Sequence, residues 1–289
     1  MSSSTALLPK AKKDDHPIFL RVCHSPWTVI GQKALVGLRA LIAVYLLVSF
    51  IVLIDYEVKH TEDGYLAYFR FSNVSYMIQL LYHWIAFVWT FMHLHYPHHS
   101  SSTSSNATAI QKAFSPPKQN PDTNNRTWFS IFYTLAQTWP LVSAFLHWAI
   151  LAPKGKTTIP ANDTFGHGSS TTFYVIDKYA VSAIIALIEI IFLSSIRRQV
   201  PIATHVGGLS FLTALFIGWV YIGYTLTGKC ALFFLDNKQM KWEHVIEGWV
   251  GLIVVTNIFF SFVYFITGAR ESLTRKGENK NTGYQSLPQ

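Results

Sequence analysis

The sequence has few charged residues and only two cysteines. Cys23 and Cys230 form no Cys-x-x-Cys pair, so neither a disulfide framework nor a zinc finger is expected. Charged residues make up 13% of the 289-residue chain and hydrophobic residues 50%. This balance is unusual for a soluble domain of this length and indicates an integral membrane protein.

Several common functional motifs are also missing. The chain has no Gly-x-Ser-x-Gly elbow, P-loop, Gly-x-Gly-x-x-Gly or His-Glu-x-x-His sequence, so none of those site types is predicted. The first thirty residues lack the apolar core of a signal peptide, and the first apolar segment is expected to direct insertion. The net charge of +8 comes from Lys and Arg in loops and tails. It favours contact with anionic membrane lipid over nucleic acid, and the sequence identifies no protein partner.

Six apolar stretches have close to the twenty residues needed to cross a bilayer. They cover residues 35–54, 71–93, 128–152, 173–193, 207–226 and 244–266. We therefore predict an all-α polytopic membrane protein with one six-helix domain over residues 35–268. An N-terminal segment, residues 1–34, precedes the domain, and a polar tail, residues 269–289, is expected to be disordered.

The distribution of Lys and Arg predicts the orientation of these segments. The loops and tails on the side of the termini hold fourteen basic residues, against eight on the other side. The positive-inside rule then places both termini in the cytosol. Sequons at Asn106 and Asn125 would lie on the unglycosylated side and Asn162 on the opposite side. Helix lengths near twenty are compatible with both the endoplasmic reticulum and the plasma membrane.

The segment 71–93 carries a polar stripe. Gln79 and His83 follow Ser72 by seven and eleven residues. On an α-helix these spacings bring them within about twenty degrees of the direction of Ser72, and Ser75 lies nearby. Polar groups at membrane depth need protein or water as partners. The pattern favours hydrogen bonding between helices, and a cavity lining or a reactive surface is the alternative.

A second polar face, in the segment 173–193, contains Tyr179, Ser182 and Glu189. Glu189 lies about one turn from the cytosolic end of its segment, and Arg39 lies about one turn into the first segment from the same side. Their matched depths predict a buried ion pair with a mainly structural role, because an unpaired charge there would be costly.

The predicted orientation gathers reactive side chains near the outer leaflet. They are Ser72, His147, Asp177, Tyr179 and His244, with His167 in a nearby loop. A hydroxyl, a base and an orienting acid are the parts of a nucleophilic site. Equal depth alone does not establish contact between them.

Two stretches resemble a known family. "YFRFSNVSYMIQLLY" is similar to the second helix of the androgen-induced gene family of six-helix membrane proteins. "ALIEIIFLSSIRRQVPIATHVGGLSFLTALFIGWVYIGYTLTGKCALFFLD" resembles its fourth and fifth helices, with an acid, a short basic loop, a proline and an aromatic-rich helix. The resemblance extends over roughly residues 35–268.

This resemblance implies a membrane hydrolase that cleaves fatty acid esters of hydroxy fatty acids, with a threonine nucleophile and a histidine. Ser72, seven residues before Gln79, occupies the nucleophile's position and keeps the hydroxyl. Tyr179, ten residues before Glu189, stands where the family has its histidine, and tyrosine is a poor general base. The base therefore comes from elsewhere, or the chain keeps the fold without the activity. The candidate bases are His147, His167 and His244.

A histidine cluster follows the segment 71–93. His93, His95, His98 and His99 include one His-x-x-His-His box of the kind found in membrane di-iron enzymes. Such enzymes need about eight ligands from several boxes, and this chain has one box. We therefore favour a solvated histidine run over a metal site, and we predict no cofactor.

The leading hypothesis is a lipid-ester hydrolase in the membrane that acts on a small lipid substrate. A non-catalytic scaffold or lipid-binding protein of the same fold is the main alternative, favoured by the absence of the family's histidine. A transporter would use the polar stripe as a pathway lining, but no Gly/Pro-interrupted helix pair or repeat supports it. A metal-dependent oxidoreductase comes last.

Overall fold

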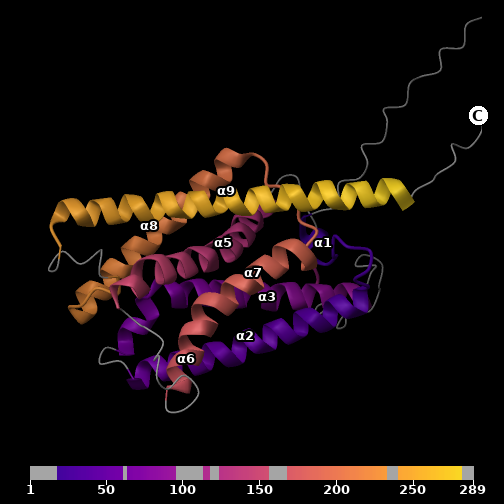
Figure 1. Cartoon of the computed structure of the whole chain (residues 1–289). Helices are drawn as coiled ribbons and strands as arrows, with labels where there is room; N and C mark the ends of the chain where they lie inside the picture. The colour runs from indigo at the N-terminus through magenta and orange to yellow at the C-terminus, as the bar shows by residue number, and fades with distance from the viewer. Residues whose placement is uncertain are drawn as a thin grey trace, which may run out of the picture.

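The computed structural model describes residues 18–60, 64–95, 113–117, 124–155, 168–232 and 240–281, and the regular structure in these ranges is helical throughout (Figure 1). The main helices are α1 (Ile18–Val22), α2 (Gln32–His60), α3 (Phe71–His95), α5 (Asn125–Phe145), α8 (Ile202–Thr227) and α9 (Trp242–Asn281). Short helical turns are η1 (Gly64–Phe69), η2 (Leu146–Leu151) and η3 (Ala152–Lys154).

One further helical segment is made of four consecutive pieces. They are α6 (Ser169–Ile176), η4 (Asp177–Val181), α7 (Ser182–Ile188) and η5 (Glu189–Leu193). The pieces η4 and η5 are π-helical, and each begins at an acidic residue. We call residues 169–193 the interrupted helix.

Five described helices are long and apolar enough to cross a membrane, which indicates a membrane protein. They cover Gln32–His60, Phe71–His95, Asn125–Lys154, Ile202–Thr227 and Trp242–Thr274. These helices correspond to five of the six predicted segments. The interrupted helix corresponds to the sixth, but it contains Asp177, Lys178 and Glu189 and is not among these five.

Helix α5 lies at the centre of the bundle, where it contacts α3, α7, α8 and α9. Its side chains join an apolar core in which Trp139 packs against Phe71 of α3 and Phe216 of α8. The outer helices instead expose large apolar side chains, for example Ile51 of α2 and Phe211 of α8. Exposed apolar side chains of this kind are suited to contact with lipid acyl chains.

Two glycines of α8 permit close contact with neighbouring elements. A Cβ atom on Gly208 would lie 2.8 Å from Cδ1 of Ile131 in α5, and one on Gly223 would lie 2.4 Å from Cγ of Phe69 in η1. Small residues commonly serve this purpose between membrane helices. The lack of a side chain at Gly223 therefore lets Phe69 of η1 pack closely against α8, and η1 leads directly into α3.

Helix α9 is longer than the sequence suggests. It continues through Asn281, so the prediction of a disordered tail from residue 269 is wrong for residues 269–281. Arg270 is buried and donates hydrogen bonds to the carbonyl oxygens of Ile190 and Ser194, both at 2.5 Å, and to that of Ile196. These bonds hold this part of α9 against the end of the interrupted helix.

Helix α2 also extends past its predicted end at residue 54. Its last two turns include Glu57, which is buried and pairs with Lys178 and Arg70. These ion pairs permit an acidic residue near the helix end to be packed inside the bundle. The length of the apolar stretch alone therefore underestimates the length of α2.

The N-terminal segment contributes to the bundle through α1. Phe19 contacts the rings of Trp89 in α3 and Phe129 in α5. Burial raises the pKa of the neighbouring Cys23 thiol to about 12, although Arg39 opposes the shift.

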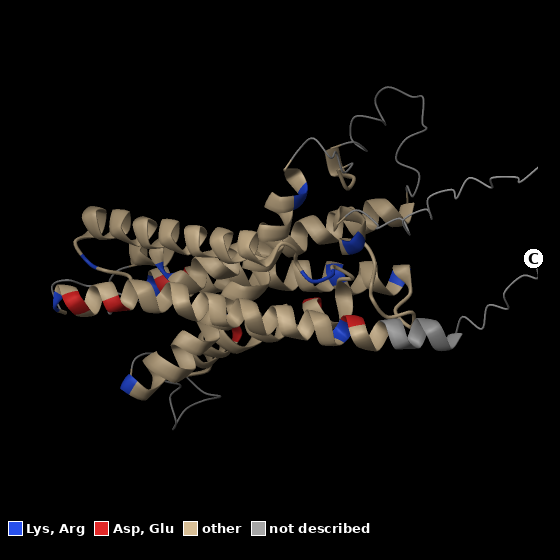
Figure 2. Cartoon of the chain, turned by 90° about the horizontal axis from the view of Figure 1, so that it is seen from above, with Lys and Arg blue, Asp and Glu red and all other residues tan. Residues whose placement is uncertain are grey.

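Figure 2 shows Lys, Arg, Asp and Glu mainly toward the two ends of the long helices, with few in between.

Candidate functional site

The polar stripe of α3 faces the interior of the bundle. Ser72, Ser75, Gln79 and His83 are all buried. The Gln79 Nε2 atom donates a hydrogen bond of 2.8 Å to the Ser182 carbonyl oxygen in α7. The Ser75 hydroxyl and both ring nitrogens of His83 have no hydrogen-bond partner within the described structure. Only part of the stripe therefore joins helices by direct hydrogen bonds.

Three of the predicted reactive residues come together at one end of this stripe. Ser72 lies in the first turn of α3, and its hydroxyl lies close to the Tyr179 side chain from η4. The ring of His147, from η2, stacks on the Tyr179 ring with a centroid distance of 3.8 Å and an interplanar angle of 7°. Three elements distant in sequence thus bring a hydroxyl, a phenol and an imidazole into one cluster.

This cluster, which we call the Ser72 cluster, is nearly closed to solvent. Ser72 keeps 8% of its surface exposed, while His147 has none. Neither ring nitrogen of His147 has a hydrogen-bond partner among the residues that the structure places. A buried imidazole in this state has a ring nitrogen available to accept a proton or to bind a ligand.

A network of buried charges adjoins the Ser72 cluster. The Lys178 Nζ atom lies 3.0 Å from Glu57 Oε2, and both side chains are fully buried. Arg70 Nη1 lies 2.6 Å from the other carboxylate oxygen of Glu57, and Asn73 Nδ2 donates to Oε2 at 2.8 Å. The network includes one chain neighbour of each cluster residue: Asn73 follows Ser72, and Lys178 precedes Tyr179. The ion pairs therefore help to hold Ser72 and Tyr179 in place.

The other residues predicted for this layer lie elsewhere. Asp177 accepts hydrogen bonds from Tyr45 and Tyr76, the latter at 3.1 Å, so its carboxylate serves contacts with α2 and α3. His244 is exposed at the start of α9, with Nδ1 3.1 Å from Glu247 Oε2. His167 lies outside the described residues. Among the described candidates for the base, His147 is the one in contact with the cluster.

The ion pair expected from sequence is present at the opposite end of the interrupted helix. Arg39 Nη2 lies 3.0 Å from Glu189 Oε1, and both side chains are fully buried. The same carboxylate oxygen accepts a 2.6 Å hydrogen bond from the Tyr82 hydroxyl. Arg39 Nη2 also donates to the Leu193 carbonyl oxygen at 3.0 Å. The pair therefore connects α2, α3 and η5, which agrees with a structural role.

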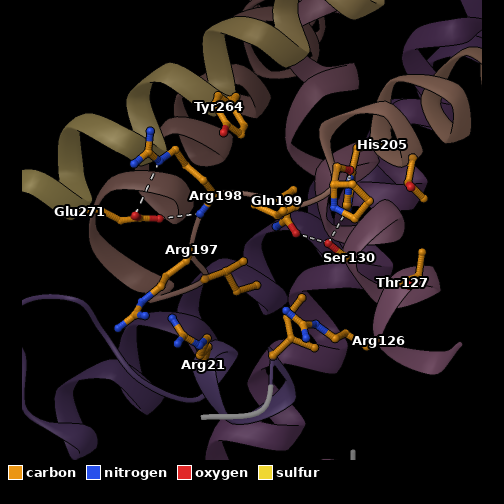
Figure 3. A pocket seen from close by; sticks show the side chains of 15 residues that line it. Arg21, Arg126, Thr127, Ser130, Arg197, Arg198, Gln199, His205, Tyr264 and Glu271 are labelled. Carbon is orange, nitrogen blue, oxygen red and sulfur yellow. Dashed lines mark hydrogen bonds and ion pairs between the residues drawn. The ribbon is translucent and has the colours of Figure 1, made fainter. Parts of the chain in front are cut away.

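A pocket of about 570 Å³ was not predicted from the sequence (Figure 3). Four arginines from three parts of the chain line it: Arg21, Arg126, Arg197 and Arg198. In the sequence these residues are recognisable only as basic loop residues that indicate helix orientation. We call this cavity the arginine pocket.

A second serine and histidine pair lies in the wall of the arginine pocket. Ser130 Oγ is 2.7 Å from His205 Nε2, and His205 Nδ1 is 3.0 Å from the Pro201 carbonyl oxygen. A carbonyl oxygen only accepts, so Nδ1 carries a proton, and Nε2 of a neutral ring is an acceptor that competes with the Gln199 amide oxygen for the single Ser130 proton. Gln199 also bonds to Ser130. Sequence spacing gave no sign of this pair, because its members are on α5 and α8.

The histidine cluster is described only in part. His93 packs edge-on against His24, with a centroid distance of 4.7 Å, and His95 contacts Phe91. His98 and His99 lie outside the described residues. Within the described ranges, no group of three or more His, Cys, Asp or Glu side chains is arranged to hold a metal ion.

No protein-family model, curated protein or solved structure matches this chain. The fold is that of a membrane-type helical bundle, with two groups of polar side chains near opposite ends of α3.

Proposed function

We propose that the interrupted helix is a sixth membrane crossing and that both termini lie in the cytosol. Its ionisable side chains are paired inside the bundle: Asp177 with tyrosines, Lys178 with Glu57, and Glu189 with Arg39. Satisfied polar groups of this kind are compatible with membrane depth. The excess of basic residues on the terminal side supports the orientation. The endoplasmic reticulum and the plasma membrane both fit this arrangement.

We propose further that the chain hydrolyses a lipid ester at the Ser72 cluster. The observation that carries this proposal is the proximity of the Ser72 and Tyr179 side chains, with His147 stacked on Tyr179. These are the two positions that the resemblance to the androgen-induced gene family pairs as nucleophile and base. Their proximity supports the register in which the resemblance was drawn. His147, stacked on Tyr179, supplies the imidazole that position 179 lacks.

The proposed reaction has two steps. Ser72 Oγ forms a bond to the ester carbonyl carbon while a ring nitrogen of His147 takes the hydroxyl proton. The carbonyl carbon then loses the alcohol, which leaves with the proton from His147. Water attacks the acylated Ser72, giving its proton to His147, and the fatty acid departs as the Ser72 hydroxyl is restored. The apolar helices around the cluster would hold the acyl chains.

A fluorophosphonate probe, which reacts with activated serines, tests this proposal on the full chain in detergent. We expect labelling of the wild type, complete loss in Ser72→Ala and a large decrease in His147→Ala. Ser75→Ala is the matched control, because Ser75 is a buried serine one turn further along the same stripe. Labelling that persists in Ser72→Ala but disappears in Ser130→Ala would move the nucleophile to the arginine pocket and overturn the assignment to Ser72.

Tyr179→His provides a gain-of-function test. This change restores the residue type that the family has at this position, close to Ser72. Because a positioned general base contributes typically 10²- to 10⁴-fold, we expect at least a tenfold faster rate of labelling or ester hydrolysis. A Tyr179→His protein that is folded but no faster than the wild type would argue against Ser72 as the nucleophile.

A non-catalytic lipid-binding protein is the second candidate function. Tyrosine at position 179 favours it, because this residue replaces the family's base. In that case folded wild-type protein would not react with the probe, and Ser72→Ala would leave the binding of lipid unchanged.

A further inference from the structure

The start of α3 holds backbone N–H groups that the described bundle does not use. Phe71 and Ser72 are the first two residues of this helix. The next two residues, Asn73 and Val74, both donate to the Arg70 carbonyl oxygen at 3.1 Å. The first N–H groups of an α-helix have no acceptor inside the helix. For Phe71 and Ser72 no other acceptor is found among the described residues, so two donors are available at the proposed nucleophile.

These donors are buried, which makes their lack of a partner informative. Phe71 keeps 2% of its surface exposed and Ser72 keeps 8%. Buried backbone N–H groups in proteins are nearly always paired. The neighbouring Asn73 is engaged elsewhere, because its amide nitrogen donates to Glu57 Oε2 at 2.8 Å and to the Ala67 carbonyl oxygen at 2.7 Å. The N–H groups of Phe71 and Ser72 therefore indicate a ligand at the start of α3.

Unpartnered side chains at the same place support this interpretation independently. His147 is fully buried, and neither of its ring nitrogens has a partner within the described part of the chain. Its ring stacks on Tyr179, whose side chain lies close to Ser72. Trp139 packs against the Phe71 ring at a centroid distance of 5.1 Å, and its buried Nε1–H has no described acceptor. Polar groups from α5 and η2 thus remain unsatisfied beside the start of α3.

Helix geometry directs the Ser72 hydroxyl and the two N–H groups toward the same region. The N–H groups of an α-helix point toward its N-terminus, and its side chains lean the same way. The positive end of this 25-residue helix adds to the attraction for negative charge. In acyl transfer the carbonyl oxygen becomes negatively charged as the nucleophile attacks the adjacent carbon, and N–H donors placed there form an oxyanion hole.

We propose that the N–H groups of Phe71 and Ser72 bind the carbonyl oxygen of the substrate and stabilise the oxyanion that forms on it. This inference rests on the proposed hydrolysis at Ser72. When Ser72 Oγ bonds to the carbonyl carbon, the electron pair of the carbonyl π bond moves to the oxygen and the hydroxyl proton moves to His147. The pair returns when the alcohol leaves with that proton. The ligands of this site are therefore carboxylic esters and electrophilic ketones.

Replacement of one backbone N–H by an oxygen atom tests the proposal on the full chain in detergent. Phenyllactic acid, the α-hydroxy analogue of phenylalanine, keeps the side chain at position 71 and removes the N–H. We expect fluorophosphonate labelling of Ser72 to become at least tenfold slower, because loss of one oxyanion-hole donor typically costs about 10²- to 10³-fold. Since this N–H has no described partner in the protein, Tm should remain close to that of the wild type.

The matched control is the α-hydroxy analogue of tryptophan at position 242. Trp242 is the first residue of α9 and is exposed. The carbonyl oxygen before it, that of Lys241, accepts from the third and fourth residues of the helix, as the Arg70 carbonyl oxygen does in α3. Both substitutions therefore weaken the same kind of backbone acceptor. The rate of labelling in the control should stay within about threefold of the wild type.

A long-chain alkyl trifluoromethyl ketone provides a second measurement, because it forms a reversible tetrahedral adduct with an activated serine. The matching methyl ketone has the same chain and serves as the control ligand. Since transition-state analogues bind at least about 10²-fold tighter than substrates, we expect a preference of that size for the trifluoromethyl ketone in the wild type. The substitution at position 71 should reduce this preference at least tenfold and leave the affinity for the methyl ketone unchanged.

Fluorine NMR of the wild-type adduct supplies a readout that needs no variant. An oxyanion held by two N–H groups should stay ionised to a lower pH than the hydrate of the free ketone. An adduct that titrates like the free hydrate would overturn the proposal even if the position 71 variant failed to fold.

The remaining outcomes separate this proposal from the proposed hydrolysis. Folded position 71 protein that is labelled as fast as the wild type, or a position 242 control that is slowed equally, would overturn the oxyanion site and leave Ser72 as the nucleophile. Folded wild type that is not labelled and forms no adduct would refute the hydrolysis, and the oxyanion site with it.

Discussion

Replacement of Glu189 by Gln should destabilise the protein strongly. The change keeps the shape of the side chain but removes the carboxylate charge that is paired with Arg39 in the described structure. Nε and Nη1 of Arg39 have no hydrogen-bond partner among the described residues, so Glu189 and the Leu193 carbonyl oxygen provide the described contacts of the guanidinium group. A buried charge without its counter-charge is costly because it has also lost its hydration.

The magnitude follows from the geometry of the pair. Two unit charges 3.0 Å apart attract by about 5.5 kcal/mol at an effective dielectric constant near 20. Removal of one partner from a buried pair typically costs about 3–5 kcal/mol. For a chain of this size, 1 kcal/mol corresponds to roughly 2–4 °C in Tm. We therefore expect Glu189→Gln to lower Tm by at least about 6 °C.

Thermal unfolding of the purified protein in detergent, followed by tryptophan fluorescence, measures this effect. The control is Arg39→Met combined with Glu189→Leu, which removes both charges and leaves apolar side chains of similar volume. Because such a replacement is often neutral, the double variant should recover most of the loss, apart from about 1 kcal/mol for the Tyr82 hydroxyl that loses its acceptor. An unchanged Tm in Glu189→Gln, or a double variant no more stable than either single one, would refute the reasoning.

Two further predictions concern packing and thiol reactivity. Gly223→Ala should destabilise the protein by about 1–3 kcal/mol, because the new Cβ atom would lie 2.4 Å from the Phe69 ring. Gly218 has open space around it, so Gly218→Ala should be neutral or stabilising. Thermal unfolding compares the two variants. Maleimide at pH 7 should label Cys230 but not Cys23 in folded protein. Cys23 is buried and the pKa of its thiol is raised to about 12, so the reactive thiolate is scarce until well above pH 10. Mass spectrometry counts the labels, and Cys23 modified before unfolding would contradict the described packing.

Helical periodicity was sufficient to predict which polar residues face the interior. The positions of Ser72, Gln79 and His83 return to one direction on an α-helix, and the structure buries all three. The pairing of Arg39 with Glu189 followed from depth, because a charge inside a membrane needs a partner and helix rise fixes the depth of each residue. Both inferences rest on properties of single helices.

The arginine pocket could not be predicted in this way. Arg21, Arg126 and Arg197 are separated by about seventy residues or more along the chain, and their meeting depends on how α1, α5 and the start of α8 pack. The pair of Ser130 and His205 depends on the same packing. Periodicity gives the face of a helix that is polar, but it does not give the neighbour that the face meets.

The interrupted helix shows why hydropathy alone describes this chain incompletely. Asp177, Lys178 and Tyr179 are consecutive and all buried, although consecutive residues of an α-helix point in different directions. Each contacts a different partner: Asp177 bonds to Tyr45 and Tyr76, Lys178 pairs with Glu57, and Tyr179 stacks on His147 beside Ser72.

The polar side chains of this segment are buried, so they are matched by neighbouring helices instead of by water. The π-helical pieces begin at Asp177 and Glu189, the two acids whose bonds reach other helices, and such pieces occur frequently at functional sites. The same contacts that enclose the charged side chains of the interrupted helix also hold Tyr179 near Ser72, and this connects the architecture of the bundle to its proposed chemistry.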